Sequence, residues 1–348
     1  MKIINYLDFV PQFSEKEAIS VSEKVYGMDV LASPLPSERD QNFLLEEKIS
    51  GKKYILKISN QKEKKEILDL QNSAMERISS YLQTHSCPKI CLTREGEKTV
   101  KIIHNQSSHY VRMVTYIEGI PLGEAFPHTP DLLQSVGEFI ARIDQALKGF
   151  SHPAAKREFY WDLQRGPETI KEFNKYIDNP DKRSLIKSFY EKFKSQARQT
   201  VSELEKTVIH NDGNDYNILV SFSDKRSLNQ KKVFGIIDFG DMVYSYTVGD
   251  IAVTAAYVML GKENFWDSAF HLIKGYSEVL RISDKELEAI SHFIYLRLCM
   301  SVVISAFQKK KHPDNKYLTI SEKKAWTLLK KLGETKIDPA YLIERTNE

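Results

Sequence analysis

The sequence predicts an α+β protein with a smaller, strand-rich N-terminal part and a larger, helical C-terminal part. Short apolar strands separated by turn residues dominate the chain up to about residue 113. Beyond Pro121, apolar residues recur at the spacing of amphipathic helices. A chain of 348 residues is long enough for each part to bury its own core.

The N-terminal part is expected to cover 1–113 and to begin with a helical lead-in over 1–24. Its helix is predicted where apolar side chains follow a helical period, at 63–82. The runs with strand character are 43–45, 54–58, 90–92, 100–103 and 110–117. The last of these ends at a Gly-Ile-Pro turn.

The C-terminal part is expected to cover 122–348. One further helix is predicted to open at Asp250, whose carboxylate suits an N-cap. The remaining segments with helical periodicity are 131–147, 184–206, 263–280, 284–308 and 321–332. This part therefore consists mainly of helices, interrupted by short strands at 208–209, 218–220 and 233–237.

Two polar segments next to these strands indicate phosphoryl-transfer chemistry. The first runs from His210 to Asn217 as H-x-D-x-x-x-x-N, and the second is an Asp-Phe-Gly-Asp sequence that begins at Asp238. In a kinase-type site, Asp212 takes the proton of an acceptor hydroxyl, while Asn217 and Asp238 hold the metal of the nucleotide. Amide and carboxylate oxygens are the ligands that Mg²⁺ prefers.

The alternative interpretation of each segment is a polar turn between core strands, because Asn, Asp and Gly are ordinary turn residues. For the 210–217 segment alone the two interpretations are balanced. The order and spacing of both segments, each flanked by apolar runs, favour the site.

A kinase-type site also requires a lysine that pairs with phosphate, and Lys57 lies in the predicted 54–58 strand. Glu66 and Asp69, three residues apart on the following helix, are both candidates to pair with it. The alternative is a solvated lysine on an edge strand. No G-x-G-x-x-G sequence precedes Lys57. Ser37 and Asn42, in the 33–42 segment that connects a first strand to the 43–45 strand, are therefore candidate phosphate contacts, or members of a polar hairpin with no ligand.

These segments carry a resemblance to the aminoglycoside phosphotransferase/choline kinase family, and within it to the hydroxylysine kinase-like branch. The resemblance runs from about residue 26 to about residue 255 and includes the segments 37–43, 56–59, 68–72, 161–163, 208–217 and 235–241. It departs from many relatives at Asn211, where they have Gly, and at Asp215, an acid that they lack. These departures concern the substrate more than the reaction.

The resemblance implies a two-lobed protein-kinase-like fold that binds ATP or GTP, with Mg²⁺, between its lobes. Residues 114–121 would then be the linker, with the backbone near Tyr116 meeting the adenine edge, although the residues alone equally allow another central strand. Asp212, Asn217, Asp238 and Lys57 match the family's base, metal ligands and lysine. His210 and Asp250 are expected to support the loop.

The acceptor is expected to be a small molecule, because the segment between Asp238 and Asp250 is too short for the activation loop of a protein kinase. Acidic and aromatic residues near the motifs suit a cationic amine: Asp215, Asp241, Tyr216, Trp161 and Asp162. Core packing is the alternative for the aromatic residues. An amino alcohol or a hydroxylated amino acid is the leading hypothesis. Kinases of aminoglycosides, choline or homoserine, a protein kinase or effector, and a silent binding module are the alternatives.

Charge, cysteine content and apolar runs limit the classes of binding partner that the sequence predicts. A net charge of +3 without a long basic cluster argues against nucleic acid. Three cysteines suggest no disulfide framework and a reducing compartment. No signal segment is evident, and the 251–260 apolar run is too short to span a bilayer. We therefore expect a cytoplasmic enzyme without a membrane partner, whose oligomeric state the sequence does not predict.

Overall fold

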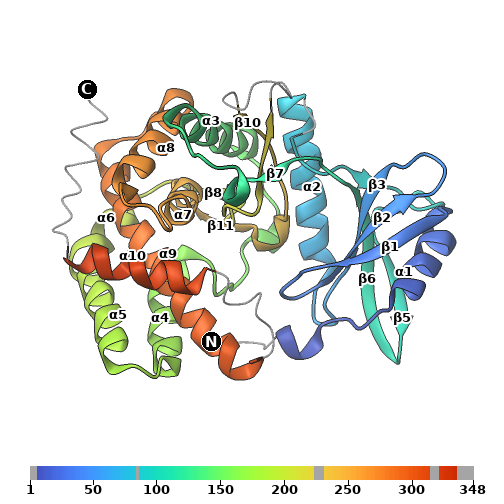
Figure 1. Ribbon diagram of the computed structural model, residues 1–348, viewed down its shortest axis with the longest axis horizontal. Helices are drawn as coiled ribbons and strands as arrows, with labels where there is room; N and C mark the ends of the chain where they lie inside the picture. Colours follow the sequence, from blue (N-terminus) through green and yellow to red (C-terminus); the bar gives the residue numbers. More distant parts are fainter. Residues whose placement is uncertain (1–5, 84–85, 223–230, 314–320, 335–348) are drawn as a thin grey trace. The chain divides into compact units, whose positions relative to one another are not determined.

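The computed structural model describes residues 6–83, 86–222, 231–313 and 321–334 (Figure 1). The chain divides into two compact units, 1–118 and 119–348. The boundary falls within the 114–121 segment, for which the sequence suggests a linker.

The N-terminal unit is built on an antiparallel sheet (Figure 1). Strand β6 (Ser107–Thr115) pairs with β3 on one side and with both β4 and β5 on the other. The strand order is β1 (Val30–Leu35), β2 (Gln41–Glu47), β3 (Lys53–Ile58), β6 and β4 (Ile90–Cys91), with β5 (Val100–His104) also on β6.

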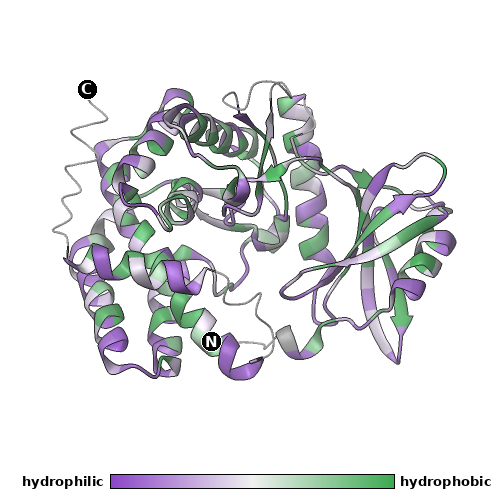
Figure 2. Ribbon diagram, viewed as in Figure 1, coloured by the Kyte–Doolittle hydropathy of each residue, from purple (hydrophilic) through white to green (hydrophobic). Residues whose placement is uncertain are grey.

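Side chains of the central strands alternate between two faces of this sheet, as the pleat requires. One face carries the buried core, in which Leu56 and Met113 pack with Ala18 of helix α1 (Glu15–Val21). Arg112, between two core positions, is also buried and donates to Asn72 Oδ1 at 2.7 Å, on helix α2 (Lys65–Leu82). Both apolar and hydrophilic residues occur along α2, as an amphipathic helix requires (Figure 2).

The elements of this unit match the predicted types but not all of the predicted limits. The connection between the first two strands is shorter than expected, because β1 extends to Leu35 and β2 already begins at Gln41. Pro34 is accommodated in β1 because this is an edge strand, where a missing N–H costs no ladder bond. Strand β6 ends at Thr115, so Tyr116 lies outside it.

The C-terminal unit is mainly helical (Figure 1). Helix α3 (Pro130–Leu147) and helix α8 (Phe265–Val279) cross at a close approach of their backbones. A Cβ at Gly137 would lie 1.9 Å from Leu272 O, and one at Gly275 would lie 2.0 Å from Gln134 O. The crossing therefore requires glycine on both helices. The other α-helices are α4 (Gly166–Phe173), α5 (Pro180–Lys192), α6 (Arg198–Ser202), α7 (Gly249–Val258), α9 (Asp284–Lys311) and α10 (Glu322–Glu334).

Two small antiparallel sheets hold the segments that the sequence singled out. Strand β8 (Lys206–Ile209) pairs with β11 (Val243–Tyr246), and Ile209 lies opposite Val243. Strand β9 (Ile218–Phe222) pairs with both β10 (Lys231–Ile236) and β7 (Ile120–Pro121). The 210–217 and 237–242 segments lie between these strands, so each is fixed at both ends.

Two predictions for this unit need correction. The helix expected over 184–206 is present as one helical run from α5 through a π-helical turn (Phe193–Ala197) to α6, but it ends at Ser202, and the chain becomes extended at Lys206. Its last residues are followed by Thr207, Val208 and Ile209, β-branched residues that suit the pairing of β8 with β11. Asp250 is not the N-cap of α7, because the helix begins at Gly249 with Val248 as its cap.

Helix α9 is long and apolar enough to cross a membrane by length and composition alone. In the structure it is a core helix, with 89% of its most apolar stretch buried inside the protein. It packs against α7 and α4. Arg297 lies in the middle of this apolar stretch and is 1% exposed.

Candidate active site

Backbone pairing brings the two polar segments together. Asn217 O accepts from Ile237 N at 2.9 Å, directly where β9 and β10 diverge into their loops. The rings of His210 and Phe239 meet edge to face, with their centroids 4.8 Å apart. The ends of the two motifs are therefore adjacent in space, as a shared site requires.

Asp250 anchors the start of the 210–217 loop. Its buried carboxylate accepts from His210 N at 2.9 Å and from Asn211 N at 2.5 Å. Asn211 has a φ of +65°, a left-handed conformation that Asn tolerates better than most residues. The charge of Asp250 thus lies beneath the loop, in the supporting position that the resemblance implies.

The side chain of Asn211 ties the loop to its neighbours. Its Nδ2 donates to Trp161 O at 3.4 Å and to Asp241 O at 3.2 Å. Glycine at this position would accept the same backbone conformation without these two bonds. Asn211 is therefore a cross-link between the loop, the 237–242 segment and the chain around Trp161.

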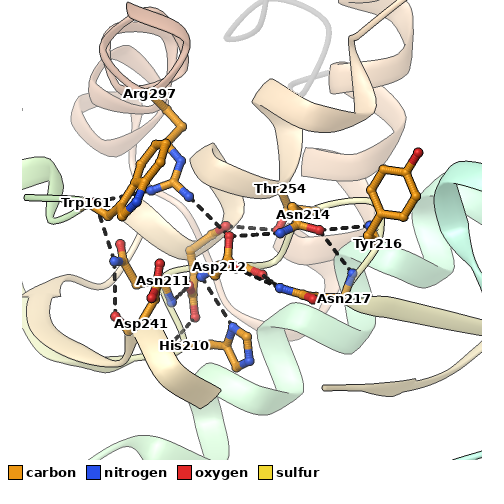
Figure 3. Close-up of polar contacts among 11 residues, drawn as sticks. Trp161, His210, Asn211, Asp212, Asn214, Tyr216, Asn217, Asp241, Thr254 and Arg297 are labelled. Carbon is orange, nitrogen blue, oxygen red and sulfur yellow. Dashed lines mark hydrogen bonds and ion pairs between the residues drawn. The ribbon is translucent and has the colours of Figure 1, made fainter. Parts of the chain in front are cut away.

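The carboxylate of Asp212 is held by three side chains (Figure 3). Oδ1 accepts from Asn214 Nδ2 at 3.0 Å and lies 3.2 Å from Arg297 Nη2. Oδ2 accepts from Asn217 Nδ2 at 2.7 Å. Asn214 also caps the loop internally, since its Oδ1 accepts from Tyr216 N and Asn217 N. The orientation of the candidate base is thus fixed before any substrate binds.

Arg297 is the site residue that the sequence analysis missed. Its guanidinium lies over the Trp161 ring, 4.3 Å from Cζ to the centroid, and Nη1 donates to Trp161 O at 3.2 Å. The Tyr257 ring lies on the same group at 5.6 Å. A fully buried arginine is rare without a charged partner, and here the partner is Asp212. The available signal was a single arginine within an apolar helical stretch.

The surroundings of Asp212 act in opposite directions on its affinity for a proton. Burial raises the pKa of Asp212 well above its ordinary value, and the charges of Asp241 and Asp238 add to this rise. The guanidinium of Arg297 opposes it. A carboxylate with a raised pKa is a better proton acceptor at neutral pH than an exposed one.

Asn217 and Asp238 form a donor set that suits a divalent cation. The Nδ2 of Asn217 is used by Asp212, donating to both Oδ2 and the backbone oxygen, so the amide oxygen is the atom left for a metal. Asp238 has a φ of +61°, a conformation that non-glycine residues rarely adopt. The carboxylates of Asp238 and Asp241 lie close enough to Asp212 for their charges to raise its pKa. Carboxylate and amide oxygens gathered in this way suit Mg²⁺ bound to phosphate.

The candidate substrate residues have different surroundings. Asp162 caps a short helical turn through Gln164 N at 2.9 Å, and it accepts from Ser245 Oγ at 2.6 Å. Asp215 contrasts with it, because Oδ1 is buried and receives no hydrogen bond from the described residues. Burial raises the pKa of Asp215. Tyr216 is half-buried in the same loop.

The candidate nucleotide residues lie in the N-terminal unit. Lys57 on β3 is flanked in register by Asn42 on β2 and by Arg112 on β6. Asp69 pairs with Lys65 of its own helix at 2.9 Å, which leaves the pairing of Lys57 with Glu66 or Asp69 a prediction.

Two other residues of this unit are candidate nucleotide contacts. Ser37 lies in the turn between β1 and β2, after Leu35 and before Gln41. Tyr116 follows β6, is 37% exposed, and donates its backbone N–H to Lys53 O at 3.2 Å. Their contacts with nucleotide stay predictions.

The antiparallel sheet unit, the helical unit and the paired polar loops define a phosphotransferase of the two-lobed, protein-kinase-like α+β class. The model of the phosphotransferase enzyme family matches residues 32–276. The chain belongs to this family and is therefore a kinase that acts on hydroxyl groups.

Curated relatives and solved structures agree with this assignment. Hydroxylysine kinase of Mus musculus is 31% identical, with 92% of this chain and 90% of the relative covered. Hydroxylysine kinase of Bos taurus is 29% identical, with the same coverage. The fold is similar to that of amicoumacin kinase in complex with AMP-PNP, Ca²⁺ and Ami (TM-score 0.69, 18% identity, 95% of this chain and 97% of that chain). It is also similar to that of a microcompartment-associated aminopropanol kinase (TM-score 0.72, 15% identity, 92% and 97%).

Proposed function

We propose that this protein transfers the γ-phosphate of ATP or GTP to the hydroxyl of a small amine-bearing acceptor, an amino alcohol or a hydroxylated amino acid of the hydroxylysine type. The observation that carries the proposal is the similarity to hydroxylysine kinases over nearly the whole chain. The constrained carboxylate of Asp212 gives the chemistry a local basis.

In the proposed reaction, Asp212 orients the acceptor hydroxyl and takes its proton. A bond forms between the hydroxyl oxygen and the γ-phosphorus as the bond to the leaving nucleoside diphosphate breaks. The hydrogen bonds from Asn214 and Asn217 and the charge of Arg297 prevent the carboxylate from rotating. Positioning of this kind supplies much of the rate enhancement in phosphoryl transfer.

Asn217 and Asp238 would hold Mg²⁺, which neutralises charge on the phosphates when it is bound. Lys57 is assigned to the phosphates as well, because it lies on the third strand of the sheet, where kinases carry this lysine. Ser37, Asn42 and Tyr116 are assigned to the nucleotide with less support.

Asp215 is the residue we assign to the acceptor amine. Its buried Oδ1 has no donor among the described residues, and an ammonium would supply both a hydrogen bond and a compensating charge. Asp162 is a weaker candidate, because its carboxylate already bonds Gln164 and Ser245. Trp161 is better explained by its contact with Arg297, and the backbone oxygen of Asp241 is the acceptor for Asn211.

The test is a phosphotransfer screen with ATP and GTP as donors. The acceptors are hydroxylysine, aminopropanol, ethanolamine, choline, homoserine, an aminoglycoside and a protein mixture. Turnover of a hydroxylated amine, absent in Asp212→Asn, supports the proposal. Phosphate incorporation into proteins alone, or no metabolite turnover with either nucleotide, contradicts it.

A further inference from the structure

A second buried acid lies behind the carboxylate that anchors the loop. Asp144, on α3, is 2% exposed and accepts from the hydroxyl of Tyr276 at 2.7 Å, through Oδ2. Tyr276 is on α8, next to Gly275 at the close crossing of α3 and α8. The glycine contacts at this crossing bring the two helices close enough for this hydrogen bond.

The other oxygen of Asp144 is an orphan unless it carries a proton. Oδ1 is buried, and no N–H or O–H of the described residues donates to it. Asp250 acts on Asp144 both through its charge and through a side-chain hydrogen bond. Asp250 already accepts from His210 N and Asn211 N and has no proton to offer if it is ionised. Two ionised carboxylates facing each other in a buried site repel strongly.

We propose that Asp144 is a positioning residue for the 210–217 loop: as a neutral acid it donates a hydrogen bond to the Asp250 carboxylate, which holds the backbone of His210 and Asn211. The chain of contacts runs from Tyr276 through Asp144 and Asp250 to the loop that carries Asp212. Each link is a hydrogen bond between buried groups, and Asp144 is the link whose proton makes the chain continuous.

The charged and titratable groups around this pair agree with the assignment. Asp250 faces Asp144 from α7, Tyr276 faces it from α8, and the charge of Asp250 also acts on the buried His210 ring. Glu286 acts on Tyr276 from α9. No cation of the described residues pairs with Asp144, and burial together with the charge of Asp250 raises the pKa of Asp144 well above its ordinary value.

The sign of the resulting pH dependence is fixed. When an acid has a higher pKa in the folded state than in the unfolded state, the folded state binds more protons above the unfolded pKa of about 4. Stability is therefore lost as the pH rises from that value towards the folded pKa. The side-chain amide of an Asp144→Asn variant would offer an N–H donor to Asp250 and an oxygen to Tyr276 without needing that proton.

The first experiment compares the urea unfolding midpoints of the wild-type protein and Asp144→Asn between pH 5 and pH 8. The urea midpoint of Asp144→Asn minus that of the wild-type protein should increase from pH 5 to pH 8. The variant should therefore be most stabilised, relative to wild type, at pH 8. A midpoint difference that stays constant with pH, or that decreases as the pH rises, overturns the proposal. This measurement needs no substrate and stands even if the proposed function fails.

The second experiment rests on the proposed function and measures phosphotransfer. Asp144→Asn should retain kcat within about twofold, whereas Asp144→Leu, which has no donor, should lose about 10- to 100-fold, mainly in kcat. Tyr276→Phe is the matched control, because it removes the bond to Oδ2 and leaves Oδ1 in place. Wild-type kcat in Asp144→Leu, or loss in Asp144→Asn equal to that in Asp144→Leu, overturns the proposal. If Asp144→Leu does not fold, the urea comparison decides.

Discussion

Arg297 Nη2 lies 3.2 Å from Asp212 Oδ1, so a residue of α9 shares the candidate base with two amides of its own loop. The guanidinium is fixed from behind by the ring and the carbonyl of Trp161. The carboxylate is therefore oriented by a tertiary contact as well as by local turn geometry.

Replacing Arg297 by Met should lower both stability and turnover. Breaking a buried ion pair from one side costs about 3–5 kcal/mol, because the remaining charge loses its partner. Arg297→Lys keeps a positive charge but cannot reach Trp161 O and Asp212 with one planar group, so we expect only partial recovery of kcat. The measurements are urea unfolding and steady-state kinetics, with exposed Arg142→Met on α3 as the control. Wild-type kcat in Arg297→Met would contradict this role.

Asp212→Asn should remove turnover while nucleotide still binds. Loss of a general base costs about 10²–10⁴-fold in rate, and the amide keeps the shape of the side chain. Calorimetric titration with a non-hydrolysable nucleotide separates the two effects. Turnover that stays near the wild-type value would remove Asp212 from the base role, whatever the acceptor.

Asn217→Ala and Asp238→Ala should weaken nucleotide binding only when Mg²⁺ is present. Both residues are proposed to act through the metal, so the affinity measured in EDTA should match that of the wild-type protein. Asp162→Asn is a useful control, since its carboxylate bonds Gln164 and Ser245 and serves the local fold. An unchanged affinity for Mg²⁺-nucleotide would exclude the metal assignment.

Asp215→Asn should change the selectivity for acceptors more than it changes kcat. Removing the charge should raise KM for amine-bearing acceptors by about 10-fold or more, on the scale of a lost charge-assisted hydrogen bond. A hydroxyl compound without an amine should be affected little. If KM for both kinds of acceptor changes equally, the amine is recognised elsewhere.

Gly137→Ala should destabilise the C-terminal unit. The added methyl would lie 1.9 Å from Leu272 O and 2.7 Å from Tyr276 N, both backbone atoms that cannot move alone. Overpacking of this kind costs about 1–3 kcal/mol, and a backbone clash belongs at the upper end. Arg142→Ala, at an exposed position of the same helix, is the control for thermal unfolding. Equal melting temperatures for the two variants would refute the close crossing.

Sequence reasoning predicted which parts of the candidate site lie together when they are close in the chain or joined by one hairpin. Asp212, Asn217 and Asp238 lie at fixed spacings next to apolar strands, and the local pairing of β9 with β10 is enough to bring them together. The α+β class and the helix at 130–147 followed from periodicity for the same reason. These features depend on neighbours within a few residues or one hairpin.

The rest depends on packing between distant segments. Arg297 reaches the loop only because α9 crosses the unit beneath it, and its sequence context resembles that of an ordinary core helix. Residue pattern alone predicted Asp250 as a local cap, and only the family resemblance indicated that its carboxylate serves a loop about 40 residues earlier in the chain. The helix expected over 184–206 ends earlier, at Ser202, because the pairing of β8 with β11 takes up the chain from Lys206.

The position of Arg297 has a practical consequence for defining a minimal enzyme. The family match ends at residue 276, before α9 begins. A fragment trimmed to that match would keep Lys57, Asp212, Asn217 and Asp238 and would still satisfy any signature built on them. It would nevertheless lack Arg297, the ion-pair partner of the candidate base Asp212, so we expect the family signature alone to be insufficient for activity in this chain.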